Sequence, residues 1–185
     1  MFLDSFIKMK NSDDESSSLL EESICMERGI YKANYEDLRE ILQLQYLSYQ
    51  SEADLFGSRD IPPLKQTLDE VIDEYNAGII LKMIDKSGNI IGSVRAKEDK
   101  GTVYIGKLMV HPQHRHRGYG TTLLAEIEQY FPEKRYELFT STRSKDNIRL
   151  YQRMGYKIFK HKAISDELQF LYFKNLNEKF KEAKI

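Results

Sequence analysis

The stretch from Leu108 to Leu124, LMVHPQHRHRGYGTTLL, places the end of an apolar strand, a loop with two glycines and the start of a helix in immediate succession. The first N–H groups of a helix have no acceptor within the helix, and the aligned peptide dipoles add partial positive charge there. Gly118 and Gly120 let a ligand approach the backbone where a side chain would collide. This junction therefore predicts a binding site for phosphate oxygens.

The charges around this junction also favour an anion. Residues 101–125 contain no carboxylate, whereas Lys107, Arg115 and Arg117 are present and three of the four histidines lie in the loop. The glycine spacing matches neither a P-loop nor a dinucleotide-binding fingerprint. Three histidines interleaved with arginines would set cations against a metal cation, so we expect no metal site here.

Length and composition indicate one globular domain with an added arm. The 185 residues include 41% hydrophobic and 31% charged side chains, and the formal net charge is -1. This balance disfavours a general nucleic-acid binder. Residues 1–23 hold six acids against two lysines, whereas the remainder holds 26 basic and 23 acidic residues. We therefore expect an acidic, serine-rich arm over residues 1–23 and one domain over residues 24–185.

Targeting signals and cysteine usage indicate the cell compartment. Every apolar stretch is far shorter than the roughly 20 residues of a membrane-spanning helix, and the N-terminus turns acidic early, unlike a secretory signal. The single cysteine, Cys25, excludes an internal disulfide and a cysteine-rich zinc site. We therefore expect a cytoplasmic protein with no membrane partner.

Hydrophobic periodicity predicts a mixed α/β arrangement of strands and helices in the order β-α-α-β-β-β-α-β-α-β-β. Strands are expected over 24–33, 79–85, 90–97, 102–110, 136–140, 156–160 and 168–174. Helices are expected after Asn34 to about residue 49, from the Pro62–Pro63 pair to Gly78, over 121–131 and over 146–154.

Two motifs carry a resemblance to a known family. RHRGYG at 115–120 is similar to the Arg/Gln-x-x-Gly-x-Gly/Ala motif of the GNAT acetyltransferase superfamily, and it stands between a strand and a helix, as it does there. NIRLYQRMGY at 147–156 resembles the family's Leu-Tyr-x-x-x-Gly-Phe/Tyr segment. The resemblance extends over roughly residues 24–174, so the acidic arm lies outside it.

The resemblance implies a mixed, mainly antiparallel seven-stranded sheet flanked by helices, with a splayed strand pair that forms the cleft for acetyl-CoA, the co-substrate. The strand end would pair with the pantetheine arm, and the glycine loop would hold the pyrophosphate. The cofactor-binding residues implied are Leu108, Met109, Val110, Arg115, His116, Arg117, Gly118, Tyr119, Gly120, Thr121, Ser144, Asn147 and Tyr151.

The resemblance also implies how the acetyl group is transferred. A backbone N–H at the strand end, between Leu108 and Val110, would stabilise the oxyanion. Tyr151 matches the tyrosine that serves as general acid to the CoA thiolate. Reference pKa values of about 10 for tyrosine and about 8.5 for a thiol make that transfer uphill by roughly 2 kcal/mol, so a hydrogen bond to the thiolate is the alternative role. A buried core tyrosine is the structural alternative.

Two departures from the family pattern affect the site. Many members have asparagine seven residues before the tyrosine, where this chain has Ser144, with Asn147 nearby. Many members also carry a glutamate on the strand that leads to the pantetheine, but residues 102–110 contain no carboxylate. The base must therefore come from elsewhere, with Glu98 and Asp99 as candidates, or the amine must arrive neutral.

The acceptor site is expected across the sheet from CoA, near the first two helices. Tyr46, Tyr49 and Glu52 lie at helical spacing and combine aromatic walls with an acid that could hold a cationic amine. A core role for both tyrosines, with Glu52 facing solvent, is the alternative. The partner is then a small-molecule or peptide amine.

We therefore expect an N-acetyltransferase that acts on a primary amine by direct attack, because Cys25 is far in sequence from both motifs. A non-catalytic CoA-binding regulatory module is the alternative, and a nucleic-acid binder is the weakest hypothesis. Exposed aromatic residues near the C-terminus favour a homodimer, namely Phe170, Tyr172 and Phe173.

Overall fold

The structure is a computed structural model that describes residues 29–165 and 168–176. The acidic arm, Cys25 and the beginning of the predicted strand 24–33 lie outside the described residues. The remainder of that strand forms β1 (Gly29–Lys32) at one edge of the sheet.

One seven-stranded sheet organises the chain, in the order β1-β2-β3-β4-β5-β7-β6. All neighbouring strands are antiparallel except β4 and β5, which run parallel. The expected α/β fold is confirmed. The further strands are β2 (Ile79–Ile84), β3 (Ile90–Asp99), β4 (Thr102–Val110), β5 (Arg135–Ser141), β6 (Lys157–Ala163) and β7 (Gln169–Leu176).

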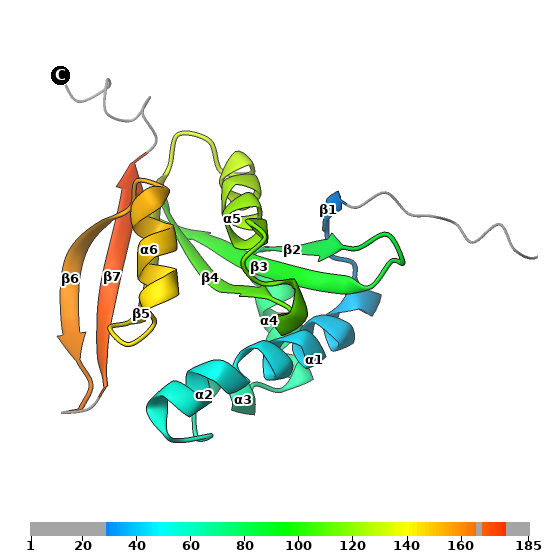
Figure 1. The fold of residues 1–185 in the computed structure, drawn as a ribbon. Coiled ribbons are helices and arrows are strands. Elements are labelled where there is room, and N and C mark those ends of the chain that lie inside the picture. The colour runs from blue at the N-terminus through cyan, green and yellow to red at the C-terminus, as the bar shows by residue number, and fades with distance from the viewer. Residues whose placement is uncertain (1–28, 166–167, 177–185) are drawn as a thin grey trace, which may run out of the picture.

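Helices cover both faces of the sheet (Figure 1). Helices α5 and α6 pack on one face, and α1 and α4 pack on the other. The helices are α1 (Leu38–Ser48), α2 (Gln50–Phe56), α3 (Pro62–Lys65), α4 (Leu68–Ala77), α5 (Tyr119–Gln129) and α6 (Lys145–Arg153), with short 3-10 turns at Tyr35–Asp37 and Pro112–His114. Within the part of the chain that the structure describes, no helix is long and apolar enough to cross a membrane.

Each face of the sheet has its own hydrophobic core. On the α5 face, Leu123, Leu124 and Ile127 are fully buried, as the helical spacing predicts, and they pack with Val94 and Val103 of the sheet. On the other face, Leu38 and Ile41 of α1 pack against Val71 of α4 and Ile80 of β2.

The helices differ from the expected ones in two places. The first predicted helix ends near Tyr49 as expected, but a further helix that was not predicted, α2, follows it directly. The second predicted helix is divided at Gln66, whose backbone is extended, and Thr67 then begins α4 as its N-cap. The Thr67 side chain accepts a hydrogen bond from the Glu70 amide, and the Glu70 carboxylate accepts one from the Thr67 amide. This capping box stabilises a new helix start where the periodicity alone predicts continuity.

Strand β4 departs from regular geometry just beyond its pairing with β5. The register with β3 shifts between Ser93 and Arg95, which pair with Met109 and Gly106, so β4 holds one extra residue there. Lys107 lies in this bulge with a φ of 51°. The parallel pairing of β4 with β5 covers only Thr102 to Tyr104. Beyond Tyr104, the edge of β4 that faces β5 has no strand partner among the described residues.

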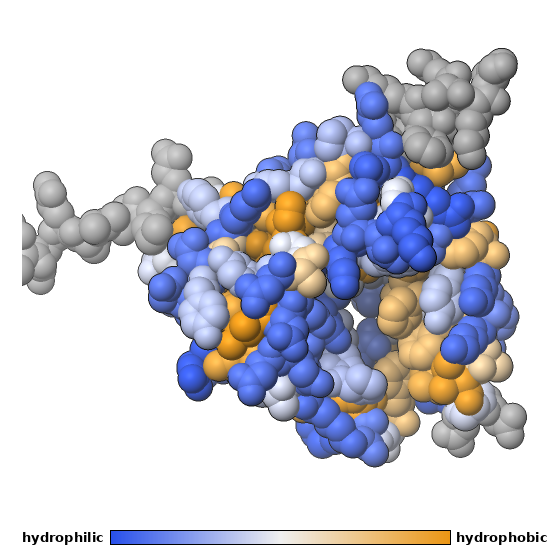
Figure 2. Space-filling view, turned by 180° about the vertical axis from the view of Figure 1, so that it is seen from behind, coloured by the Kyte–Doolittle hydropathy of each residue, from blue (hydrophilic) through white to orange (hydrophobic). Residues whose placement is uncertain are grey.

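The half of the sheet formed by β5, β7 and β6 has α6 on one face and an aromatic cluster on the other. Phe139, which is 55% exposed, has ring centroids 5.3 Å from Phe170 and 5.4 Å from Tyr172. Figure 2 shows this open face beside a central hollow, with hydrophobic side chains along one side. Phe173 was expected to be exposed, but it is 0% exposed because it faces the α6 core against Tyr151.

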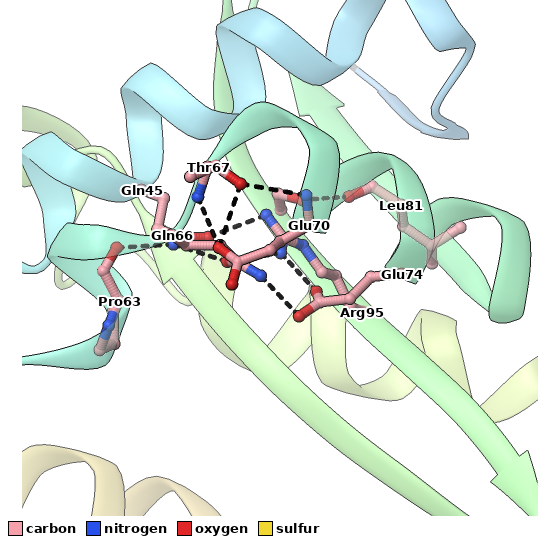
Figure 3. A network of polar contacts seen from close by, with 9 residues as sticks. Gln45, Pro63, Gln66, Thr67, Glu70, Glu74, Leu81 and Arg95 are labelled. Atoms are coloured by element: carbon pink, nitrogen blue, oxygen red, sulfur yellow. Dashed lines mark hydrogen bonds and ion pairs between the residues drawn. The ribbon is translucent and has the colours of Figure 1, made fainter.

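A buried polar network joins β3 to the helices of the α1 face (Figure 3). Arg95 is only 5% exposed, and its guanidinium donates to Glu74 Oε2 (2.5 Å), to Gln66 Oε1 (3.1 Å) and to Gln45 Oε1 (2.8 Å). Gln45 also donates to the Pro63 carbonyl oxygen at 2.8 Å. The network therefore fixes α1, α3 and α4 relative to the middle of the sheet.

Replacing Glu74 with alanine should leave the buried Arg95 guanidinium without its carboxylate. We expect Glu74→Ala to lower the free energy of unfolding by about 2 kcal/mol, below the usual value for a buried pair because Glu74 is itself 41% exposed on its side chain. Asp73→Ala, an exposed acid on the same helix, should change the stability by less than about 0.5 kcal/mol. Urea unfolding of both variants measures the difference, and equal losses would contradict the role of the network.

Candidate functional site

A cavity of about 790 Å³ opens where β4 and β5 diverge. Its lining comes from four parts of the chain: the end of β4, the loop that leads into α5, the junction of α1 and α2, and the first turns of α6. The predicted residues Leu108, Met109 and Val110 all line it. The strand end that the sequence predicts for the cofactor therefore forms one wall of this cavity.

The glycine loop places the start of α5 at this cavity. Gly118 is the N-cap residue of α5 and has a φ of 81°, in the left-handed region that glycine adopts without strain. The chain therefore turns directly into the helix, and α5 begins at Tyr119, two residues earlier than predicted. Gly118, Tyr119, Gly120 and Thr121 line the cavity. The first turn of α5 thus directs its N–H groups and its positive dipole end toward the same space.

Gly120 is also where α5 and α6 approach each other. A Cβ atom built on Gly120 would lie 3.1 Å from Leu150 Cδ1 of α6, which is tighter than ordinary van der Waals contact. Glycine at this position therefore permits close contact between two elements that both line the cavity.

The two loop arginines have different surroundings. The Arg115 guanidinium donates to the Ser48 carbonyl oxygen (2.7 Å), to Ser51 Oγ (2.9 Å) and to the Val110 carbonyl oxygen (3.4 Å). Its side chain therefore ties the loop to the junction of α1 and α2. His116, with a φ of 60°, lines the cavity. The exposed Arg117 is not among the lining residues.

Glu52, Ser144 and Asn147 form one cluster across the cavity. Glu52 Oε1 accepts hydrogen bonds from Ser144 Oγ at 2.9 Å and from Asn147 Nδ2 at 3.3 Å, and Asn147 Nδ2 lies 3.4 Å from Thr140 Oγ1 of β5. The sequence predicted Glu52 for the acceptor and the other two for the cofactor. Helical spacing gave no signal for this contact, because it joins residues more than 90 positions apart.

The environment of Glu52 changes its protonation equilibrium. Burial raises the pKa of the Glu52 carboxyl above its ordinary value, while the Ser144 hydrogen bond and the Arg115 charge oppose that rise. A raised pKa means that the neutral acid forms at a higher pH than it does for a solvated glutamate.

Tyr151 lies at the edge of the α6 core. Its side chain is 6% exposed, and its ring centroid is 5.5 Å from that of Phe173 and 6.2 Å from that of Tyr156. Burial, followed by the nearby Tyr49 and Glu52, raises the pKa of the Tyr151 hydroxyl well above its ordinary value. Leu150 and Arg153 line the cavity on either side of it in sequence, whereas Tyr151 is not among the described lining residues.

The three residues predicted for the acceptor separate into two groups. Tyr49 and Glu52 line the cavity. Tyr46 instead donates its hydroxyl hydrogen to the Gln66 carbonyl oxygen and packs in the α1 core. The rival base candidates Glu98 and Asp99 lie at the other end of β3, where they pair with the start of β4 and Glu98 contacts Lys134. This is roughly 20 Å along the strand from Leu108.

A second cavity, of about 650 Å³, lies beside β4 on the α3 and α4 side. Four carboxylates line it, from Asp60, Glu70, Asp73 and Glu74. Lys107 of the bulge lines it too, with its Nζ 5.7 Å from the centroid of the Tyr49 ring. Tyr49 lines the first cavity, so the contact between Lys107 and Tyr49 lies between the two cavities. Burial lowers the pKa of the Lys107 ammonium.

Neither cavity contains a set of metal ligands. Among residues 29–165 and 168–176, no group of three or more His, Cys, Asp and Glu side chains is arranged to hold a metal ion.

Comparison with known proteins identifies the family. The sequence model of the acetyltransferase (GNAT) family matches residues 35–156, about two thirds of the chain. The chain belongs to the GNAT acetyltransferase family. The matched range contains the glycine loop and all of β4, β5 and α6, so the elements around the first cavity are those of a GNAT domain.

Solved GNAT structures share the fold at low sequence identity. PaiA N-acetyltransferase from Thermoplasma acidophilum, in complex with coenzyme A, is 19% identical and has a TM-score of 0.66 over 81% of this chain and 100% of that one. A phosphinothricin acetyltransferase from Sinorhizobium meliloti, in complex with acetyl-CoA, is 16% identical and has a TM-score of 0.64 over 83% and 90%.

One curated protein also matches in sequence. UPF0157 protein YqkA from Bacillus subtilis is 24% identical over 120 residues, which are 64% of this chain. The match spans only about a third, 34%, of the length of that relative. It therefore describes a shared segment and not a shared whole protein.

Removing the Arg115 side chain should loosen the glycine loop. Because Arg115→Gln cannot make all three hydrogen bonds to Ser48, Ser51 and Val110, we expect the free energy of unfolding to fall by about 1–2 kcal/mol. Arg117→Gln, two residues away and exposed, should change it by less than about 0.5 kcal/mol. Denaturant unfolding measures both, and faster amide hydrogen exchange over 115–121 in the Arg115 variant alone would locate the effect. Wild-type stability of Arg115→Gln would contradict the role of Arg115 in fixing the glycine loop to the junction of α1 and α2.

Proposed function

We propose that this protein is an acetyl-CoA-dependent N-acetyltransferase that transfers an acetyl group to a primary amine by direct attack. The observation that carries the proposal is that one cavity combines an anion-binding helix start with a strand edge that lacks a strand partner among the described residues. The first turn of α5 suits a pyrophosphate. The edge of β4 near Leu108 to Val110 suits the amide groups of a pantetheine arm, which can pair with it as a neighbouring strand would.

The charges of the cavity support a multiply phosphorylated ligand. Besides Arg115 and His116, the lining includes four cationic side chains from the start and outer face of α6, namely Arg143, Lys145, Arg149 and Arg153. The volume of about 790 Å³ lies within the usual range for cofactor sites. The PaiA and phosphinothricin enzymes, solved with coenzyme A and acetyl-CoA, share this fold.

The second cavity supports a cationic acceptor that approaches from the α3 and α4 side. An alkyl amine is an ammonium ion at neutral pH, and the lining of this cavity, with four carboxylates against Lys65 and Lys107, carries a net negative charge that attracts it. The contact between Tyr49 and Lys107, which lies between the two cavities, is then the point at which the acceptor reaches the thioester. The proposed acceptor is accordingly a small-molecule or peptide amine.

Tyr151 would act on the leaving group. Its raised pKa makes complete proton transfer to a thiolate less favourable than for an ordinary tyrosine, which supports a hydrogen bond to the departing sulfur as its main contribution. Such a bond requires the hydroxyl to reach the cavity from the edge of the core.

The proposal is tested by following acetyl-CoA consumption with a panel of amines, with the thiol product measured directly. We expect turnover with at least one primary amine and a fall in kcat of about tenfold to 100-fold for Tyr151→Phe, with little change in the binding of CoA. Tyr172→Phe, on the open face of β7, is the matched control and should retain full turnover. Unchanged kcat in Tyr151→Phe would assign that residue to the core alone.

Calorimetry separates an enzyme from a non-catalytic binding module. The observation that favours a binding module is that β4 carries no carboxylate that could act as a base. Binding of CoA without turnover of any amine would support the module and contradict the enzyme.

The glycine at the start of α5 offers a further check on where CoA binds. Gly118→Ala and Gly101→Ala both place a side chain at a φ of +81° with nothing within 4 Å. We therefore expect both to cost about 1 kcal/mol of stability. Only Gly118→Ala should weaken the binding of CoA, by about tenfold, because Gly101 lies in the hairpin between β3 and β4, remote from the cavity. Equal CoA affinities in calorimetry would exclude the α5 start as the phosphate site.

A further inference from the structure

The proposed reaction needs a base that β4 does not supply. The acceptor reaches the site as an ammonium ion, and a nitrogen without a lone pair cannot attack a thioester. Strand β4, residues Thr102–Val110, contains no carboxylate. Glu98 and Asp99 lie at the remote end of β3. The base must therefore come from another element, and its assignment rests on the proposed function.

Two carboxylates line the cavity of the proposed cofactor, Glu52 and Asp146. Asp146 is exposed, lies in the first turn of α6 and faces Arg149 at 3.5 Å. Glu52 is partly buried and accepts its two hydrogen bonds from neutral donors, Ser144 and Asn147. Of the two, only Glu52 combines shielding from solvent with a carboxylate that no ion pair within 4.0 Å neutralises in the described part of the chain.

Glu52 also lies between the ends of the two diverging strands. On the β4 side, the adjacent Ser51 binds Arg115, whose Nε donates to the Val110 carbonyl oxygen. On the β5 side, Asn147 joins Glu52 to Thr140. These two short chains of contacts place the carboxylate in the gap between β4 and β5, where the thioester would meet the amine.

Other titratable groups near the gap fit the role less well. Lys107 lines the other cavity and not the gap, with its Nζ against the Tyr49 ring. Burial lowers the pKa of its ammonium group, while Glu74 and Glu70 oppose that shift. His116 lies in the glycine loop, beside the start of α5 where the phosphates would bind.

We infer that Glu52 is the general base of this acetyl transfer. Its carboxylate takes one proton from the ammonium group, directly or through one water molecule, and the freed lone pair forms the C–N bond with the thioester carbon. The C–S bond then breaks, and the thiolate receives the second nitrogen proton, relayed by Tyr151 or by water. Glu52 passes its proton to solvent, so the net products are the amide, CoA thiol and one proton.

The surroundings of Glu52 determine the pH at which it can act. Burial raises its pKa, and the Ser144 hydrogen bond and the Arg115 charge lower it. The hydroxyls of Tyr49 and Tyr151 are the other titratable groups that interact with it, and both remain neutral at physiological pH because their own pKa values are raised. A base must be deprotonated, so the reaction rate should fall as the pH drops through the raised pKa of Glu52.

The test compares pH profiles of kcat/KM and kcat for the wild type, Glu52→Gln and Ser144→Ala. We expect Glu52→Gln to lower kcat by about 100-fold and to lose the acidic limb. In Ser144→Ala, the acidic limb should move to higher pH, because the hydrogen bond that lowers the Glu52 pKa is absent. Glu98→Gln is the matched control and should keep the wild-type profile.

Separate measurements distinguish a base from a merely structural glutamate. The side-chain amide that Glu52→Gln introduces keeps an oxygen that can accept from Ser144, so this variant should unfold at the wild-type temperature. If kcat and the acidic limb survive in the variant while only the acceptor KM rises, Glu52 binds the ammonium ion and is not the base. If only the KM of acetyl-CoA rises, it merely bridges α2 and α6.

Failure of the inference and failure of the proposed function give different results. An active wild type whose Glu52→Gln variant is equally active removes the base assignment alone. A wild type that consumes no acetyl-CoA with any amine removes both.

Discussion

Every backbone N–H and C=O group needs a hydrogen-bond partner, and this structure depends on that constraint. One edge of β4 finds these partners by pairing with β3. Its other edge, among the described residues, pairs with a strand only as far as Tyr104. Beyond that residue the two strands diverge, and the free edge of β4 faces a cavity instead of β5. A ligand with alternating amide groups can supply the missing hydrogen bonds. We propose that this unpaired edge of β4 is where the pantetheine arm binds.

The divergence also divides the sheet into two halves whose facing strands pair only briefly, although one hydrophobic core on the α5 and α6 face extends over both halves. At one end, three residue pairs connect β4 to β5. At the other end, side chains cross the gap: Glu52 accepts from Ser144 and Asn147, and Arg143 Nη1 donates to the Leu55 carbonyl oxygen at 3.0 Å. The Arg95 network, in contrast, holds the first half together internally. The width of the cavity thus depends on polar contacts between α2 and the start of α6, which water or a ligand can replace at low cost.

The sequence predicted the elements that local physics determines. Strand and helix periodicity located all seven strands and the two helices of the later half, and the glycine pair located the start of α5 to within two residues. These features depend on neighbours in sequence, so a single chain contains the information.

Features that depend on distant residues were not predictable in this way. The bulge in β4 places Lys107, a residue with no special preference for positive φ, in the left-handed region, and nothing in a run of β-branched and apolar residues indicates it. Arg95 lies in a strand, and strand alternation alone does not show that its charge is buried. The charge is buried because Glu74 of α4, Gln66 of the connection between α3 and α4, and Gln45 of α1 all bind it. The cluster of Glu52 with Ser144 likewise needs the tertiary fold.

Charge distribution connects the site to the opening stretch of sequence. From Gly101 to Ala125 the chain has no carboxylate, which suits phosphates but leaves the reacting end of the cavity without a base of its own. Glu52 enters that end from α2, a different part of the chain, and its contacts are with neutral donors and with Arg115 at a distance. Phosphate binding needs positive charge, whereas proton removal needs a carboxylate. Because separate segments of the chain supply the two, the carboxylate stays away from the proposed anion site.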